Sequence, residues 1–231
     1  MHIPDGFLGP GTSTTLVAAA LGAVSFAFSK IRKGFFAKQR KPALVTPEGM
    51  QVSSGGNVTM LTKYGRDKIF RMATVASFIF AAQMINFPIA DGTSGHLLGG
   101  VLAAVLLGPL EGLIVVSAVL VIQSLLFADG GLVALGANIF NMGVIGTIAG
   151  YYIYTLLKKY LKHKLPSVFI AAWLSVVLAS IGASAELALS NTIAFSAVFP
   201  AMVGVHALIG IGEGIITLAV IWYMCEEKIN E

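Results

Sequence analysis

The chain has 231 residues, of which 56% are hydrophobic and 11% are charged, and its formal net charge is +4. A soluble domain usually carries about a quarter charged residues, so this composition excludes an ordinary soluble domain. The positive charge does not indicate nucleic-acid binding, because the basic residues avoid the apolar segments and gather in short stretches, as membrane topology demands.

Apolar segments long enough to cross a bilayer recur along the chain. A helix needs about 18 or more residues with almost no charge to span roughly 30 Å of hydrocarbon. We expect one all-α integral membrane domain over residues 1–231, with about seven transmembrane helices near residues 11–29, 69–89, 95–108, 110–127, 132–157, 167–189 and 197–225. The third segment is short, and only Gly108 and Pro109 separate it from the fourth, which predicts a tight hairpin.

The lysines and arginines predict the orientation of these helices. Fourteen of the fifteen lie between Lys30 and Arg71 or between Lys158 and Lys164, and the last is Lys228. With seven spans all these regions lie on one side, which the positive-inside rule makes the cytoplasm. We therefore expect a multi-pass protein of a prokaryotic plasma (inner) membrane, with the amino terminus outside and the carboxyl terminus in the cytoplasm. The outward carboxylates, which either attract cations or only solvate their loops, are Asp5, Asp91 and Asp129.

A polar stretch at about residues 31–68 separates the first two apolar segments. It contains Pro42, Pro47, Gly55 and Gly56 and shows no apolar periodicity, so we expect a basic cytoplasmic loop. Its basic residues either remain solvated or contact anionic membrane lipid or a partner protein.

The first two residues, Met1 and His2, form a potential metal chelate. The Met1 amine, the backbone nitrogen of His2 and Nδ1 of its imidazole can hold one ion in fused rings and fill three positions of a square plane. A backbone nitrogen binds only after losing its proton, which copper and nickel achieve readily, and planar nitrogen ligation is typical of these ions. No basic residue precedes Lys30, which argues against a signal peptide.

A fourth ligand must come from another histidine. His163 lies among the cytoplasmic lysines, on the wrong side for capture from outside. His96 lies at the outer start of the third segment, after glycines that permit close backbone approach and hydroxyls that could orient a ligand. His206 lies within the last span, where it is either functional or a structural histidine that pairs with Glu186 or Glu213.

Other polar residues expected inside the membrane each need a partner there, and helix-to-helix hydrogen bonding is their default role. Asn138 and Asn141 are three residues apart and should share a helix face. With Gln123, they could brace the loop that holds Met1 and His2. The remaining residues expected around the metal are Asp5, Asn86, Thr93 and Ser94.

Seven stretches resemble the CbiM/NikM family. They read MHIPDGFL at residues 1–8, NFP at 86–88, GTSGHLLGG at 92–100, QSLLFADGG at 123–131, GANIFNM at 136–142, AEL at 185–187 and HALIGIGEG at 206–214. The likeness spans nearly the whole chain, apart from the loop at 31–68. Members of this family are substrate-specificity (S) components of energy-coupling-factor transporters for nickel or cobalt.

The resemblance implies a seven-helix bundle with an inserted amino terminus, in which the Met1 amine, the His2 amide and imidazole, and the His96 imidazole hold the metal. It also implies that the chain is not an enzyme. ATP hydrolysis would belong to separate CbiO- or NikO-like subunits, which act with a CbiQ- or NikQ-like transmembrane coupling subunit and a small accessory membrane subunit. Nickel is the expected cargo and cobalt the alternative, because cobalt-type members commonly begin with a cleaved signal peptide.

Two rival functions use residues deeper in the membrane. An intramembrane metalloenzyme or a proton-coupled secondary metal transporter would each be built on His206, Glu186 and Glu213. The sequence has no HExxH motif to support the enzyme.

Overall fold

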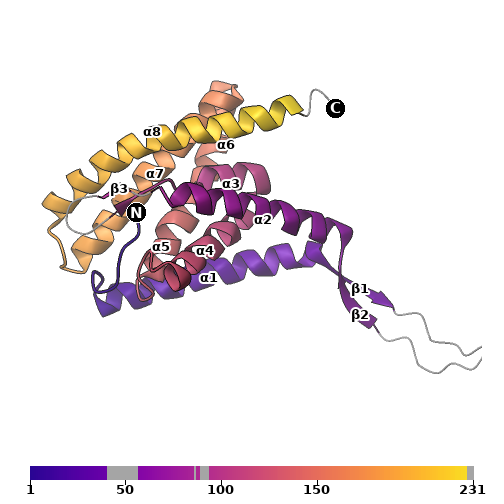
Figure 1. Ribbon diagram of the computed structural model, residues 1–231, viewed down its shortest axis with the longest axis horizontal. Helices are drawn as coiled ribbons and strands as arrows, with labels where there is room; N and C mark the ends of the chain where they lie inside the picture. The colour runs from indigo at the N-terminus through magenta and orange to yellow at the C-terminus, as the bar shows by residue number, and fades with distance from the viewer. Residues whose placement is uncertain (41–56, 86, 89–93, 228–231) are drawn as a thin grey trace, which may run out of the picture.

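The computed structural model describes residues 1–40, 57–85, 87–88 and 94–227, most of them helical (Figure 1). The helices are α1 (Pro10–Phe35), α2 (Lys63–Gln83), α3 (Gly100–Leu107), α4 (Pro109–Leu126), α5 (Leu135–Asn138), the π-helical segment η2 (Ile139–Ala149), α6 (Gly150–Leu161), α7 (Lys164–Leu189) and α8 (Phe195–Glu227). Two short antiparallel pairs complete the described part of the chain: β1 (Phe36–Arg40) with β2 (Asn57–Leu61), and β3 (Phe87–Pro88) with β4 (Ser94–Gly95).

The long helices make this a mainly helical, multi-pass membrane protein. In the described residues, five helical stretches are long and apolar enough to cross a membrane, and they are Pro10–Phe35, Pro109–Leu126, Leu135–Leu161, Lys164–Leu189 and Phe195–Met224. The third of these joins α5, η2 and α6 without a break. Each of the five overlaps a segment predicted from the sequence.

The other two predicted segments differ from expectation. α2 has 21 residues, but it begins at Lys63 and its first half is rich in charged side chains. α3 has eight residues, about 12 Å of helix, which is too short to cross the hydrocarbon. The segment predicted at 95–108 is thus helical only from Gly100 to Leu107. The count of seven spans and the outside position of the amino terminus stay predictions.

The predicted hairpin between the third and fourth segments is present. Gly108 is the single residue between α3 and α4, and its φ of 110° lies in the region that favours glycine. The two helices pack against each other.

The predicted loop at 31–68 contains regular structure. α1 continues to Phe35, and the β1–β2 hairpin follows directly. The side chain of Thr62 then accepts a hydrogen bond from the N–H of Gly65 at 2.8 Å, which caps the start of α2. The residues that suggested a loop, Pro42, Pro47, Gly55 and Gly56, lie outside the described residues.

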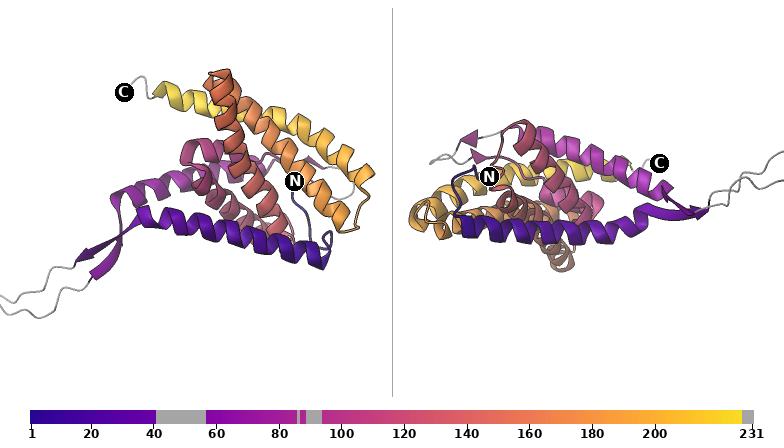
Figure 2. Two further views of the ribbon diagram at one scale, coloured as in Figure 1. Left: turned by 180° about the vertical axis from the view of Figure 1, so that it is seen from behind. Right: turned by 90° about the horizontal axis from the view of Figure 1, so that it is seen from below.

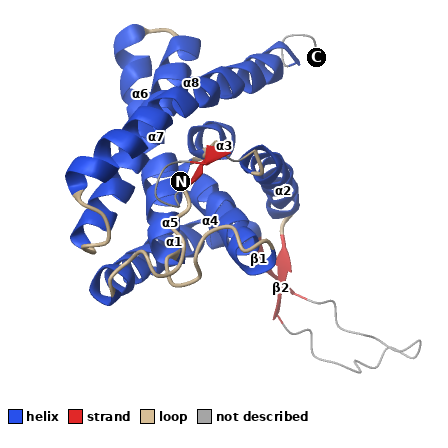
Figure 3. Cartoon of the chain, turned by 60° about the vertical axis from the view of Figure 1, so that its left-hand side comes forward, coloured by secondary structure: helices blue, strands red, loops and turns tan. Residues whose placement is uncertain are grey.

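The amino-terminal segment runs from the start of α1 into the middle of the bundle (Figures 1 and 2). In Figure 3 its end lies among α3, α5 and α7, near the β3–β4 pair. Met1 and Ile3 are 1% and 0% exposed and belong to the main apolar core. The first residues are therefore part of the packed interior.

Candidate metal centre

Asn138 at the end of α5 fixes the path of the amino-terminal segment. Its side-chain oxygen accepts a hydrogen bond from the N–H of Ile3 at 2.8 Å, and its side-chain nitrogen donates to the Ile3 carbonyl at 3.1 Å. The N–H of Gly131 donates to the same carbonyl at 3.0 Å. Because both polar groups of Ile3 are held, the residues before it enter the bundle in one defined direction.

Asp5 attaches the same segment to the residues that lead into α5. Its carboxylate accepts hydrogen bonds from the N–H groups of Val133 (2.7 Å), Leu132 (3.1 Å) and Ala134 (3.3 Å). N–H groups at a helix start lack partners within the helix and favour a negative charge. A β-carbon on Gly131 would lie 2.2 Å from Oδ1 of Asp5, so this close approach requires glycine.

His2 and His96 meet inside the bundle. Their ring centroids are 4.5 Å apart, their planes cross at 81°, and the residues are 4% and 0% exposed. Nδ1 of His96 lies 2.6 Å from the Leu97 carbonyl; since a carbonyl only accepts, Nδ1 carries the proton and Nε2 keeps its lone pair. Nε2 of each ring is buried with no hydrogen-bond partner among the described residues. Such buried polar atoms are costly, which favours a ligand between the rings.

Asp129 brings a negative charge to these rings. Its Oδ1 lies 3.2 Å from Nδ1 of His2, and this contact lowers the pKa of the Asp129 carboxyl. The sequence placed Asp129 only among the outward carboxylates. Gly130, with a φ of 87°, turns the chain here, and a β-carbon on it would lie 2.8 Å from Nδ1 of His2. The glycine lets the loop press directly against the imidazole.

The Met1 amine is buried beside the two imidazoles. Burial lowers the pKa of this amine from 8.0 to about 4, although the nearby Asp129 raises it. The lowered pKa favours the uncharged amine at neutral pH, which is the form that can bind a metal ion. The amine and His2 both act electrostatically on His96. The three residues predicted as ligands thus lie together.

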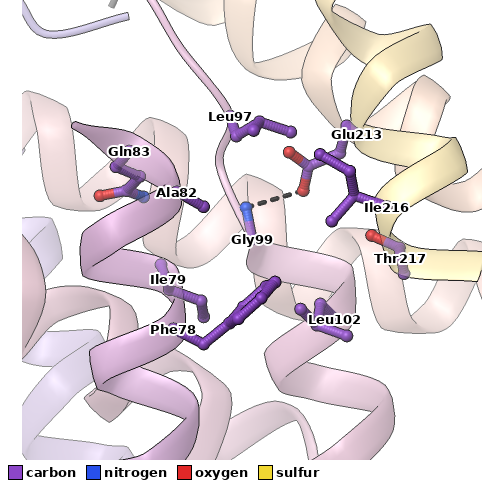
Figure 4. A pocket seen from close by; sticks show the side chains of 10 residues that line it. All are labelled: Phe78, Ile79, Ala82, Gln83, Leu97, Gly99, Leu102, Glu213, Ile216 and Thr217. Atoms are coloured by element: carbon purple, nitrogen blue, oxygen red, sulfur yellow. Dashed lines mark hydrogen bonds between the residues drawn. The ribbon is translucent and has the colours of Figure 1, made fainter. Parts of the chain in front are cut away.

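Two helices hold the loop that carries His96. Gln83 of α2 donates through Nε2 to the Leu98 carbonyl at 2.7 Å. On the other side of the loop, the Glu213 carboxylate of α8 accepts a hydrogen bond from the N–H of Leu98 at 2.8 Å. It accepts a second one from the N–H of Gly99 at 2.7 Å, which Figure 4 shows. Sequence reasoning missed this role, since a polar residue inside a membrane signals that it has a partner without identifying it.

The other predicted residues are placed differently. Asn141 donates to Oε2 of Glu186 at 2.7 Å and so contacts α7 instead of the amino-terminal segment. Gln123 is fully buried, and both polar atoms of its side chain lack a partner in the part of the chain that the structure describes. Ser94 is a residue of β4, and Asn86 and Thr93 lie outside the described residues.

The three residues of the rival functions do not form a ligand set. Glu186 is bonded to Asn141, and Glu213 to the His96 loop. Within the described ranges, no group of three or more histidine, cysteine, aspartate or glutamate side chains could hold a metal ion.

Known proteins resemble this chain in sequence and in fold. The family model CbiM, the cobalt uptake substrate-specific transmembrane region, matches residues 49–229. The chain is 34% identical over 230 residues to a putative fused nickel transport protein NikMN of Archaeoglobus fulgidus, covering 99% of this chain and 66% of that protein. It is 31% identical to the cobalt transport protein CbiM of Acetoanaerobium sticklandii, covering 95% and 82%. The crystal structure of a truncated transition metal transporter is 32% identical, with a TM-score of 0.82 over 98% of this chain and 99% of that one.

Proposed function

Since the chain belongs to the CbiM family, we propose that it captures a divalent transition metal, nickel in preference to cobalt, at the outer face of the plasma membrane. The observation that carries this proposal is the buried contact of His2 with His96, whose ring centroids are 4.5 Å apart, with Nε2 of His96 unpartnered in the described residues and the Asp129 carboxylate 3.2 Å from Nδ1 of His2. The relatives named for nickel and for cobalt transport support a metal of this class.

The proposed ligands are four nitrogens from three residues. They are the Met1 amine, the deprotonated amide and Nδ1 of His2, and Nε2 of His96, which the Leu97 contact leaves unprotonated. Four nitrogens in a plane suit nickel(II) better than ions that favour tetrahedral sites. Asn138 and Asp5 do not bind the metal themselves. Their hydrogen bonds fix the amino-terminal segment, which carries the ligands of Met1 and His2.

The charges of the proposed site balance. A divalent ion bound to one deprotonated amide leaves a single positive charge, and Asp129 supplies a single negative charge next to His2. A buried charge is costly unless it is compensated. Asp129 therefore favours the loaded site.

Asp129→Asn is expected to weaken nickel binding by about tenfold, roughly 1.4 kcal/mol, because the amide keeps the shape of the carboxylate and removes its charge. Calorimetric titration of the purified full chain measures this change. Asp67→Asn, on an exposed position of α2, is the matched control and should leave the affinity unaltered. Equal affinities for the two variants would exclude a role for the Asp129 charge.

Adding one residue before Met1 is expected to abolish nickel binding, since the amine becomes a peptide nitrogen and the added residue would have to fit beside the buried Met1. The native protein should hold an equimolar amount of nickel, whereas the extended protein and His96→Ala should hold none. His163→Ala is the control, because His163 is exposed and lies directly before the start of α7. If the extended protein binds nickel like the native one, Met1 and His2 are not the ligands.

We further propose that the chain acts as the substrate-specificity subunit of an ATP-driven, energy-coupling-factor uptake transporter. A transmembrane coupling subunit and separate ATPase subunits would drive release of the metal to the cytoplasm. The family match supports this role, and the chain itself spans 66% of the length of the fused NikMN relative.

A further inference from the structure

A third imidazole, that of His206 in α8, also has a buried nitrogen without a partner. The residue is 0% exposed, and its Nδ1 lies 2.7 Å from the Met202 carbonyl one turn earlier in the same helix. Because the carbonyl can only accept, Nδ1 carries the proton and Nε2 keeps a lone pair. This Nε2 makes no hydrogen bond to any residue that the structure describes. The ring is thus fixed by its own helix and presents an unused acceptor.

His206 lies on the face of α8 that contributes to the apolar core around Met1. Val198 and Met202 belong to the same apolar cluster as Met1, and positions 198, 202 and 206 follow the four-residue spacing of one helix face. The Met1 amine acts electrostatically on His206, and His206 acts on His96. The unused acceptor therefore belongs to the surroundings of the amine.

We propose that Nε2 of His206 accepts a hydrogen bond from the Met1 amine when that amine binds the metal, and so holds the amine in the plane of the four nitrogens. This inference rests on the proposed function. An amine bound to a metal keeps two N–H donors, and an imidazole nitrogen with a lone pair matches them. His206 is a positioning residue, because the plane already has its four ligands. Two residues of α8 would then position different ligands. Glu213 holds the loop that carries His96, and His206 holds the Met1 amine.

The test compares His206→Gln with His206→Phe in the purified full chain. The glutamine side chain offers an oxygen that can accept the same hydrogen bond, whereas phenylalanine fills the space without an acceptor. Nickel chloride titration should show about tenfold weaker binding for the phenylalanine variant and near-native binding for the glutamine variant. X-ray absorption and visible spectra of the bound nickel should remain those of a planar four-nitrogen complex in every variant that binds. His163→Phe, at an exposed position, is the control.

Two results would overturn the proposal. Native affinity in the phenylalanine variant would show that the acceptor is not used. A fifth nitrogen in the native spectrum that disappears in this variant would make His206 a ligand instead. If the phenylalanine variant does not fold, His206→Asn replaces it in the test. The asparagine side chain is too short to reach the amine, so this variant is also expected to bind nickel weakly. Unchanged nickel binding by the amino-terminally extended protein would refute the proposed function itself, a separate outcome.

Discussion

Gly131→Ala is expected to abolish nickel binding, or to weaken it by at least about a hundredfold, in a protein that still folds. The β-carbon it adds would lie 2.2 Å from Oδ1 and 2.4 Å from the backbone nitrogen of Asp5. Neither atom can yield, because three N–H groups hold the carboxylate and Asn138 holds the chain two residues earlier. The first five residues must therefore move away from the loop, and the amine and imidazole of the proposed chelate move with them.

Calorimetric titration with nickel measures the loss for Gly131→Ala, and the reactivity of the Met1 amine toward an acylating reagent provides a second readout. The amine should react faster in the variant, because it leaves the protein interior. Gly212→Ala is the matched control, since a β-carbon on Gly212 meets nothing within 4 Å. Native affinity together with an unreactive amine in Gly131→Ala would show that the segment tolerates the added carbon and that this contact does not hold the site.

Sequence reasoning located the long apolar helices because a helix in lipid must satisfy its backbone internally and therefore leaves a continuous apolar stretch. The segments predicted at 110–127 and 167–189 agree closely with α4 and α7. The helix predicted at 95–108 was wrong for its first five residues, since α3 begins only at Gly100. Leu98 is buried there although it lies in a loop, and hydropathy cannot separate a buried loop residue from a buried helix. The left-handed φ of 72° at Gly99 marks where the helix begins.

The ligand set could be predicted because it depends on local chemistry: an amine, an amide and an imidazole in two consecutive residues. The hydrogen bonds that hold these ligands in place could not be predicted from the sequence. Asn138 reaches Ile3 across 135 positions, and Glu213 reaches Leu98 across 115. No spacing in the sequence encodes such pairs.

The prediction that Asn138 and Asn141 share a helix face assumed α-helical geometry. Asn141 lies in η2, whose π-helical turn is wider than an α-helical turn. A separation of three residues therefore turns the side chains apart. Asn138 contacts Ile3, and Asn141 contacts Glu186 of α7.

Glu213→Ala is expected to lower both the thermal stability of the chain and its nickel affinity. Without the carboxylate, the buried N–H of Leu98 and the partly buried N–H of Gly99 lose their acceptors, at a cost of about 1–3 kcal/mol for a fully buried group. The loop then holds His96 less firmly, so a ligand is displaced although Glu213 itself binds no metal. Glu213→Gln keeps one acceptor oxygen and should fall between the native protein and the alanine variant. Thermal unfolding in detergent and nickel titration measure the two effects.

Glu186→Gln separates this positioning role from the rival functions. Glu186 accepts a hydrogen bond from Asn141 and makes none with the described residues of the His96 loop, so its replacement should affect stability and leave nickel affinity at the native value. A metalloenzyme or proton-coupled site built on both carboxylates requires the two variants to impair metal handling alike. If nickel affinity falls in the Glu213 variants and is native in Glu186→Gln, the Glu213 carboxylate acts through the His96 loop that it holds. If both variants lose nickel equally, the metal lies deeper in the bundle than His2 and His96.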